Sequence, residues 1–436
     1  MDDFLAARLQ MAVSLGFHII YASIGMTMPF FMFVAELKWL KTGKDVYLQL
    51  AKAWSKGVAI FFAIGAVSGT VLSFELGLLW PEFMKHAGPI IGMPFSWEGA
   101  AFFIEAIALG LFLYGWKRLN KWVHLGSGLL IGIAGVTSGF FVIAANGWMN
   151  SPEGFEWING RAVNIDPFDA MFNAAWISQS VHMIIAAFAA TGFAVAGVHG
   201  AILLKHKESQ FHKNALRIAL TFGAIASLIQ PLSGDYSAKD IAKRQPEKLA
   251  AMESLFETQE KAPLIIGGIP DAEKKEVKLG IEIPGFLSFL AFGNFNAEVK
   301  GLDQIPREDW PPVLLTHISF QIMVLFGMIM AAIAILFLLF RWKWEYLLEK
   351  PWWLRILTFA TPIGFIALET GWMVTELGRQ PWIIYKIMRT KDALTPMPGI
   401  VYPLILISII YLILTFLSVY LMRRQIRYVH EKRLNS

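Results

Sequence analysis

The sequence predicts an all-α, polytopic membrane protein with nine transmembrane helices. Of its 436 residues 56% are hydrophobic and only 16% are charged, whereas a soluble domain has about 25% charged residues. Apolar stretches long enough to cross a bilayer recur nine times, and the loops between them alternate in charge. The chain has no cysteine, which excludes disulfides and every thiolate-held metal centre.

A transmembrane helix needs about 20 predominantly apolar residues. The N-terminus, Met1-Asp2-Asp3, is acidic, whereas a cleavable signal peptide begins with basic residues. We therefore count the first apolar stretch as a membrane span. The predicted spans are 10–35, 57–77, 96–116, 123–147, 176–203, 216–233, 312–340, 355–375 and 398–422.

Basic residues mark every second loop, which predicts the orientation of the chain. Cytoplasmic loops carry an excess of Lys and Arg, so the N-terminus is expected outside and the C-terminus in the cytoplasm. The net charge of +5 then reflects loops that face anionic lipid. The basic residues are Lys38, Lys41, Lys44, Lys52, Lys117, Arg118, Lys121, Lys205, Lys207, Lys213, Arg341, Lys343, Lys350, Arg423, Arg424, Arg427, Lys432 and Arg433.

One hydrophilic insert divides the chain into helices one to six (1–233), an extracytoplasmic loop (234–310) and helices seven to nine with a cytoplasmic tail (311–436). The insert is too long for an ordinary connector, which favours a functional loop. Residues 245–259 have helical spacing, whereas 265–284 are rich in Gly and Pro and predict irregular structure.

Histidines within the spans are candidate ligands, because neutral imidazole commonly binds metal or haem iron. For His18 and His182 we weigh this equally against a hydrogen bond to a neighbouring helix; for His317 the structural role is favoured. The other six lie in loops or at span ends, which favours structural roles. They are His86, His124, His199, His206, His212 and His430.

Two pairs of carboxylates repeat one spacing. Glu98 and Glu105 are seven residues apart, so they share one helix face about 10 Å apart along the axis. No Lys or Arg lies between Trp97 and Trp116, which favours a proton relay or ligand pair over an ion pair. Glu369 and Glu376 repeat the spacing.

Trp372 lies between Glu369 and Glu376, and Arg379 follows. Arg379 is either an interfacial anchor or a cation that neutralises a nearby carboxylate or propionate.

Most of these polar residues are expected at a common depth, in the outer half of the membrane. A His/Met pair, a lone His and a lone Glu are typical axial ligands of several haems, although Met323 alone could be core filler. The residues at this depth are His18, Glu98, Glu105, His182, Met323 and Glu376.

Three short motifs complete the pattern: Gly378-Arg379-Gln380-Pro381-Trp382, Ala145-Asn146-Gly147-Trp148-Met149 and Lys248-Leu249-Ala250-Ala251-Met252-Glu253. With nine spans, they make the chain resemble, over essentially its whole length, subunit I of the cytochrome bd-type quinol oxidases. The short insert places it with the short quinol-loop members.

The resemblance implies the cofactors and their ligands. His182 and Met323 match the ligands of a low-spin haem b, and Glu376 that of a high-spin haem b. His18 matches the ligand of the oxygen-reducing haem, which is haem d or a further haem b.

Further site residues are implied in the same way. Glu98 lies at the oxygen-reducing haem and Glu105 acts in proton delivery, whereas Asn146 matches a motif position without a clear role. Trp372 is an aromatic near the high-spin haems, Arg379 a cation close to haem, and Lys248 and Glu253 belong to the quinol site.

The implied function is that of a terminal oxidase in the cytoplasmic membrane of a bacterium or archaeon. It oxidises ubiquinol or menaquinol at the outer face and reduces oxygen with cytoplasmic protons, without pumping. A second large subunit and a small single-span subunit are the expected partners. Gln321 stands where well-known members carry Arg, which predicts a changed charge near the low-spin haem. The alternatives are a colourless transporter or channel and a quinol dehydrogenase with low-spin haems only.

Overall fold

The computed structural model describes the backbone of residues 1–434 and the side chains of residues 1–427. Within this part, nine helical segments are long and apolar enough to cross a membrane, as predicted. They are α1 (Asp3–Thr42), α2 (Asp45–Leu79), α3 (Pro81–Tyr114), α4 (Lys121–Asn150), α5 with α6 (Pro167–Met171, Trp176–Leu203), α7 (Gln210–Arg244), α10 (Val313–Lys343), α11 with α12 (Pro351–Ala360, Ile363–Leu377) and α13 (Val401–Leu434).

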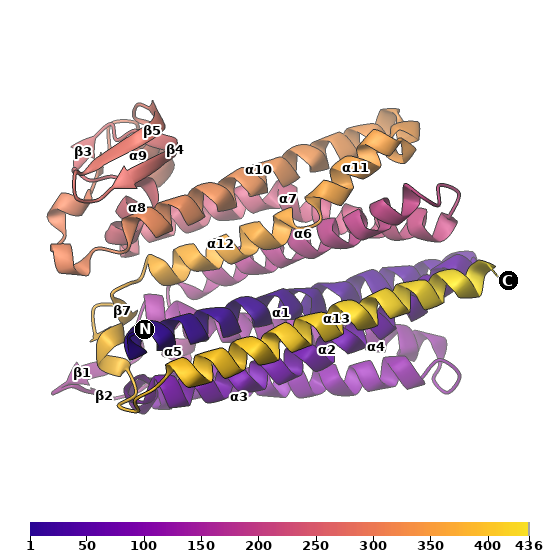
Figure 1. Cartoon of the computed structure of the whole chain (residues 1–436), viewed down its shortest axis with the longest axis horizontal. Helices are drawn as coiled ribbons and strands as arrows, with labels where there is room; N and C mark the ends of the chain where they lie inside the picture. Colours follow the sequence, from indigo (N-terminus) through magenta and orange to yellow (C-terminus); the bar gives the residue numbers. More distant parts are fainter. Residues whose placement is uncertain (435–436) are drawn as a thin grey trace.

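The long helices run side by side along the long axis of the molecule (Figure 1). The N-terminus and the small lobe that contains β3, β4 and β5 lie at one end, and the C-terminus lies at the other. This agrees with the predicted placement of the termini and the hydrophilic loop. Following the charge pattern, we call the end with the N-terminus the outer end. Lys432 and Arg433 lie outside the described side chains.

Helix α3 begins well before the predicted span. Pro81 occupies its first turn, where the missing N–H has no partner to lose, and the helix continues through Pro89 and Pro94. Consequently Glu98 lies near the middle of α3 and Glu105 in its inner half. The expectation that Glu105 lies in the outer half is therefore wrong, because prolines and charges made the first turns look like a loop.

Helix α7 continues to Arg244, so the first part of the predicted loop is helical. Ion pairs one turn apart support this extension: Lys239 pairs with Asp235 at 2.6 Å, and Arg244 pairs with Asp240. The hydrophilic loop proper therefore begins near Gln245.

The loop contains a β-hairpin where irregular structure was expected. Strands β4 (Leu264–Asp271) and β5 (Glu276–Ile283) are antiparallel, with Ile266 opposite Ile281. Alternating β-branched residues favour strands, and they outweigh the glycines, two of which adopt positive φ in β4. The prediction for 265–284 is wrong.

Short elements complete the ends of the bundle. They are α8 (Pro246–Glu253), α9 (Phe286–Phe292), β1 (Glu156–Ile158), β2 (Arg161–Val163), β3 (Gln259–Glu260), β6 (Glu298–Val299), β7 (Trp382–Ile384), β8 (Met388–Arg389), and 3-10 turns at Leu302–Gln304, Arg307–Asp309, Glu345–Glu349 and Thr390–Ala393. Strands β1–β2, β3–β6 and β7–β8 form two-stranded antiparallel sheets.

Helices α6 and α7 approach each other closely at a pair of glycines. A Cβ atom added to Gly192 would lie 2.5 Å from the Cα atom of Gly223. Small residues permit such contact between membrane helices, which replaces the hydrophobic driving force that lipid cannot supply. This contact fixes the helices that carry His182 and its neighbours.

We expect Gly192→Leu to lower the apparent melting temperature of the purified protein, because overpacking costs about 1–3 kcal/mol. Gly110→Leu is the matched control, since a Cβ atom at Gly110 meets nothing within 4 Å. Thermal unfolding followed by size-exclusion chromatography measures both variants. Equal shifts in the two would contradict the packing argument.

Candidate functional site

Sequence neighbours of two candidate ligands, His18 and His182, belong to one apolar cluster that joins α1, α4, α6 and α12. Ile19 follows His18 in this cluster, Met183 follows His182, and Leu368 and Trp372 come from α12. Three helices that are distant in sequence, α1, α6 and α12, thus pack together at the depth of these residues. The cluster explains how residues far apart along the chain share one depth.

The ring of His18 is held from α2. Its Nδ1 lies 2.9 Å from the Ser68 hydroxyl, which itself donates to the carbonyl of Gly65 at 3.1 Å. Since the Ser68 proton is used, Ser68 accepts the Nδ1 proton of His18. The Nε2 lone pair is therefore left for another group.

His182 is held in the same way from α7. Its Nδ1 lies 3.0 Å from the Ser233 hydroxyl, which donates to the carbonyl of Gln230 at 2.9 Å. The side-chain amide of Gln230 contacts both ring nitrogens, Nδ1 at 3.2 Å and Nε2 at 3.1 Å. A metal-bound histidine typically donates its other ring N–H to a nearby acceptor. His18 has this arrangement, and His182 would have it once the Gln230 amide moved away from Nε2.

His124 and His317 differ, because each of their ring nitrogens faces a carboxylate or backbone carbonyl oxygen. His124 contacts Glu36 Oε1 at 2.7 Å and the carbonyl of Phe112 at 2.9 Å. His317 contacts the carbonyls of Met252 at 2.7 Å and Gly267 at 2.9 Å. Oxygen partners on both sides hold each ring in place, which favours structural roles for both.

Two of the candidate ligands pack directly against the backbone of a glycine on a neighbouring helix. A Cβ atom on Gly69 would lie 3.0 Å from His18 Cε1, and one on Gly371 would lie 3.0 Å from Met323 Sδ. Neutral imidazole, thioether and carboxylate are ligands that haem iron accepts. The oriented Nε2 atoms and this donor set fit haem.

Glu98 and Glu105 both face α4, as their spacing predicts. Ser138 donates to Glu98 Oε1 at 3.4 Å, and a Cβ atom on Gly135 would lie 3.6 Å from Glu105 Oε2. Among the described side chains neither carboxylate forms an ion pair. They remain candidates for a proton relay, in which Glu105 lies in the inner half of the membrane and Glu98 lies closer to its centre.

Glu369 places a carboxylate against α1 at Gly16. Its Oε2 would lie 3.2 Å from a Cβ atom on Gly16, and its buried Oε1 has no hydrogen-bond partner among the described residues. The sequence singled out Glu369 by its spacing to Glu376. Its contact with α1 could not be predicted, because spacing within one helix does not show which other helix lies beside it.

Glu376 is bound by two side chains at the outer end of α12. Arg379 pairs with its Oε2 at 2.5 Å, and Asn146 donates to its Oε1 at 2.6 Å. Arg379 is only 2% exposed and also donates to the carbonyls of Trp382 and Ile383. It is therefore a buried neutralising cation and not an interfacial anchor.

Lys248 and Glu253 are buried in α8, with exposed fractions of 1% and 4%. Burial lowers the pKa of Lys248 to about 7 and raises the pKa of Glu253 to about 8. Lys248 donates to Asn150 Oδ1 at 2.6 Å, whereas Glu253 Oε2 has no hydrogen-bond partner among the described residues.

The hairpin is held on α10 by His317 and Gln321, which are one turn apart. The Gln321 amide accepts from the backbone N–H of Gly267 and donates to the carbonyl of Ile265, both at 2.9 Å. Gln321 thus binds β4 as another strand would. The sequence predicted only a change of charge at this position.

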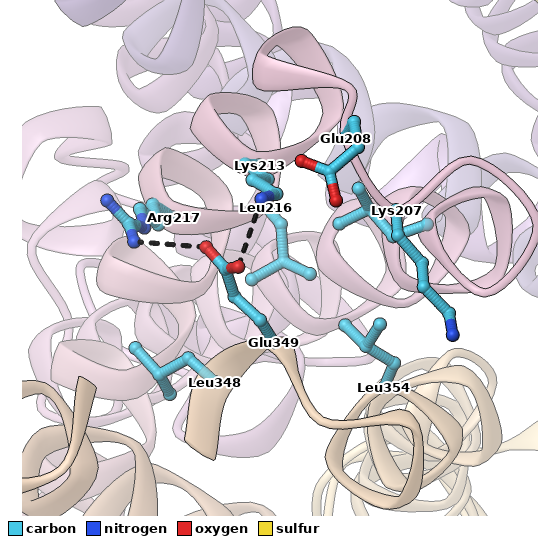
Figure 2. Close-up of a pocket in the computed structure, with 9 residues that line it drawn as sticks. Lys207, Glu208, Lys213, Leu216, Arg217, Leu348, Glu349 and Leu354 are labelled. Carbon is cyan, nitrogen blue, oxygen red and sulfur yellow. Dashed lines mark hydrogen bonds and ion pairs between the residues drawn. The ribbon is translucent and has the colours of Figure 1, made fainter. Parts of the chain in front are cut away.

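A separate cavity of about 140 Å³ lies at the inner end, between α6, α7 and the turn before α11 (Figure 2). Glu349 pairs there with Lys213 at 2.9 Å and with Arg217 at 3.8 Å. These pairs join α7 to the 345–349 turn. The cavity is distant from the candidate ligands and its charges are largely paired, so we assign it to packing.

Known proteins resemble the whole chain. The sequence profile of the family described as "Cytochrome bd terminal oxidase subunit I" matches residues 6–430. A putative cytochrome bd menaquinol oxidase subunit I of Bacillus subtilis is 36% identical, with 97% of this chain and 96% of the relative covered. A cytochrome bd ubiquinol oxidase subunit 1 of the same organism is 34% identical, with 98% and 94% covered.

The fold is similar as well. A chain in the structure of bd oxidase from Geobacillus thermodenitrificans matches with a TM-score of 0.93 and 37% identity, over 98% of this chain and 99% of that one.

We expect the docking of α8 to weaken as pH rises. Because the pKa of Glu253 is raised from 4.5 to about 8, protonated Glu253 stabilises the folded loop fully below 4.5, and this contribution is lost as pH rises to about 8. Hydrogen exchange across residues 246–267, corrected for intrinsic rates, should therefore increase from about pH 5 to about pH 8.

Glu253→Gln should reduce this pH response, whereas Glu257→Gln, a change at an exposed neighbour, should leave it as in the wild type. An unaltered response in Glu253→Gln would show that another group controls the loop.

Proposed function

Because the chain belongs to the subunit I family of cytochrome bd terminal oxidases, we propose how its residues divide the work of quinol oxidation and oxygen reduction. The family makes it part of a haem-containing quinol:oxygen oxidoreductase of the respiratory chain. It is a multi-pass protein of the bacterial cytoplasmic membrane. A subunit I acts together with a subunit II and takes a quinol as substrate.

In our proposal, His182 and Met323 would hold a low-spin haem b and Glu376 a high-spin haem b. His18 would hold the oxygen-reducing haem, either haem d or a further haem b. The bound haems supply electron transfer and the iron at which oxygen is reduced. The ring of His18 carries this proposal, since its bond to Ser68 leaves Nε2 for another group. His182 has the matching serine contact, and iron at its Nε2 would replace the amide of Gln230.

Quinol, either menaquinol or ubiquinol, would bind at the outer end between the loop and the helices. Lys248 can donate a hydrogen bond to a quinol oxygen, and Glu253 can take up a quinol proton as its carboxylate. Burial supports these roles, because it brings the pKa of each group close to neutral pH. Protons released here leave to the outside.

Protons for water formation would come from the cytoplasm through Glu105 and then Glu98. Glu105 lies nearer the inner end of α3, and Glu98 lies two turns further out on the same face. Because release and uptake occur on opposite sides of the membrane, charge is separated without a pump.

Large apolar side chains on α3 are exposed in the isolated chain, including Phe103, Ile107 and Leu111. Such a surface fits lipid or partner helices. We propose that subunit II and a small single-span subunit cover part of the apolar exterior.

His182→Ala and Met323→Leu should each abolish the low-spin haem signal in a reduced-minus-oxidised spectrum of the purified complex. The other haem signals should remain, because their ligands lie on other helices. His86→Ala, which changes a half-buried histidine at the start of α3, is the control. A normal spectrum in both ligand variants would exclude this assignment.

Glu376→Ala should remove or alter a high-spin haem signal and preserve the low-spin signal, since Glu376 offers an oxygen ligand beside Arg379. Spectra of the purified complex with and without CO distinguish the two haem classes. Glu82→Ala, at an exposed turn of α3, should leave both signals intact. If only the low-spin signal disappears in Glu376→Ala, the ligands are wrongly sorted.

A further inference from the structure

We propose that Asn150 and Asn146 are positioning residues that couple Lys248, at the quinol site, to Glu376, the ligand of the high-spin haem. This inference rests on the proposed function, because it takes the roles of Lys248 and Glu376 from there. What it adds is a physical connection between the two sites. Occupancy of the quinol site would thereby change how Glu376 is held.

A continuous series of hydrogen bonds forms the connection. Lys248 Nζ donates to Asn150 Oδ1 at 2.6 Å. Asn150 Nδ2 donates to the carbonyl of Asn146 at 3.0 Å and to its Oδ1 at 3.2 Å. Asn146 Nδ2 then donates to Glu376 Oε1 at 2.6 Å. The two asparagines are one turn apart on α4, so a single helix end carries the link.

Every donor in this series points the same way, from the lysine to the carboxylate. Lys248 supplies only donors and the Glu376 carboxylate only acceptors, so the two ends fix the orientation of both amides. Hydrogen bonds aligned in series polarise one another, most strongly where the surroundings have low dielectric. A change in the hydrogen bond of Lys248 therefore alters the strength of the hydrogen bond at Glu376 Oε1.

Burial leaves the series few alternatives. Lys248 and Asn150 are each 1% exposed, and among the described residues Lys248 forms no ion pair. A Cβ atom on Gly378 would lie 2.7 Å from Lys248 Cγ, so the lysine stem packs directly on the segment between Glu376 and Arg379. A buried donor that loses its partner costs about 1–3 kcal/mol, which opposes any rearrangement.

Substrate binding changes the first bond of the series. A quinol oxygen that accepts a hydrogen bond from Lys248 competes with Asn150 Oδ1 for the same Nζ donors. Asn150 Oδ1 then keeps only the longer bond from Gln245 Nε2, at 3.4 Å. Asn150 is therefore less constrained, and Asn146 holds Glu376 less firmly. Quinol at the outer site would in this way adjust the ligand field of the high-spin iron before electrons arrive.

A double-mutant cycle on the purified complex tests the coupling. Lys248→Met and Asn150→Leu should each shift the absorption band and midpoint potential of the high-spin haem in the same direction. The double variant should show no further shift, because either change already breaks the series. Asn146→Leu, which removes the direct bond to Glu376, should weaken retention of the high-spin haem about tenfold.

The low-spin haem is the internal reference and should not shift in any of these variants. Asn214→Leu is the matched control: it removes an asparagine that hydrogen-bonds Tyr47 on the far side of the molecule. If Asn150→Leu fails to assemble, Asn150→Ser replaces it, since a hydroxyl can accept from Lys248 but is too short to reach Asn146. It should shift the high-spin haem as the leucine variant does.

The coupling is wrong if Lys248→Met slows quinol turnover while neither Asn150 variant moves the high-spin haem, or if the single shifts add in the double variant. Those results would leave the proposed function standing. A wild-type complex that lacks a high-spin haem would instead overturn the proposed function itself.

Discussion

The ion pair between Arg379 and Glu376 is the interaction on which the outer end of the molecule depends. Arg379 is almost completely buried, whereas the Glu376 side chain is 29% exposed. Loss of Glu376 would leave the guanidinium uncompensated, which costs up to about 3–5 kcal/mol for a fully buried charge. Through this pair, the end of α12 is joined to the β7 strand by the bonds from Arg379. Asn146 joins it to α4. The carboxylate that is suited to bind iron is thus also a structural junction.

The loop is held in a different way, because side chains of α10 form hydrogen bonds with its backbone groups. His317 hydrogen-bonds the carbonyls of Met252 and Gly267. Gln321 hydrogen-bonds the N–H of Gly267 and the carbonyl of Ile265. Met323 lies on the same helix two residues after Gln321. The loop and the thioether therefore share one rigid support, which suits a site where substrate binding and electron transfer occur close together.

The sequence predicted the nine spans and the depth of His18, His182, Met323 and Glu376, because apolar length and loop charge are local properties. It misplaced Glu105, since Pro89 and Pro94 concealed the first half of α3, and it missed the β4–β5 hairpin, whose glycines resemble those of a loop. Ser68, Ser233 and Asn150 escaped notice for another reason. A serine or asparagine carries no sequence signal of which residue on another helix it will bind.

The central claim is that His18 and His182 present Nε2 to iron, in a chain that carries both an electron-transfer haem and an oxygen-reactive haem. The most direct measurement is the reduced spectrum of the wild-type complex, recorded before and after addition of CO. We expect a low-spin haem signal that CO leaves unchanged, together with a high-spin signal that CO shifts. A complex without bound haem, or one whose haems are all unreactive to CO, would contradict the account.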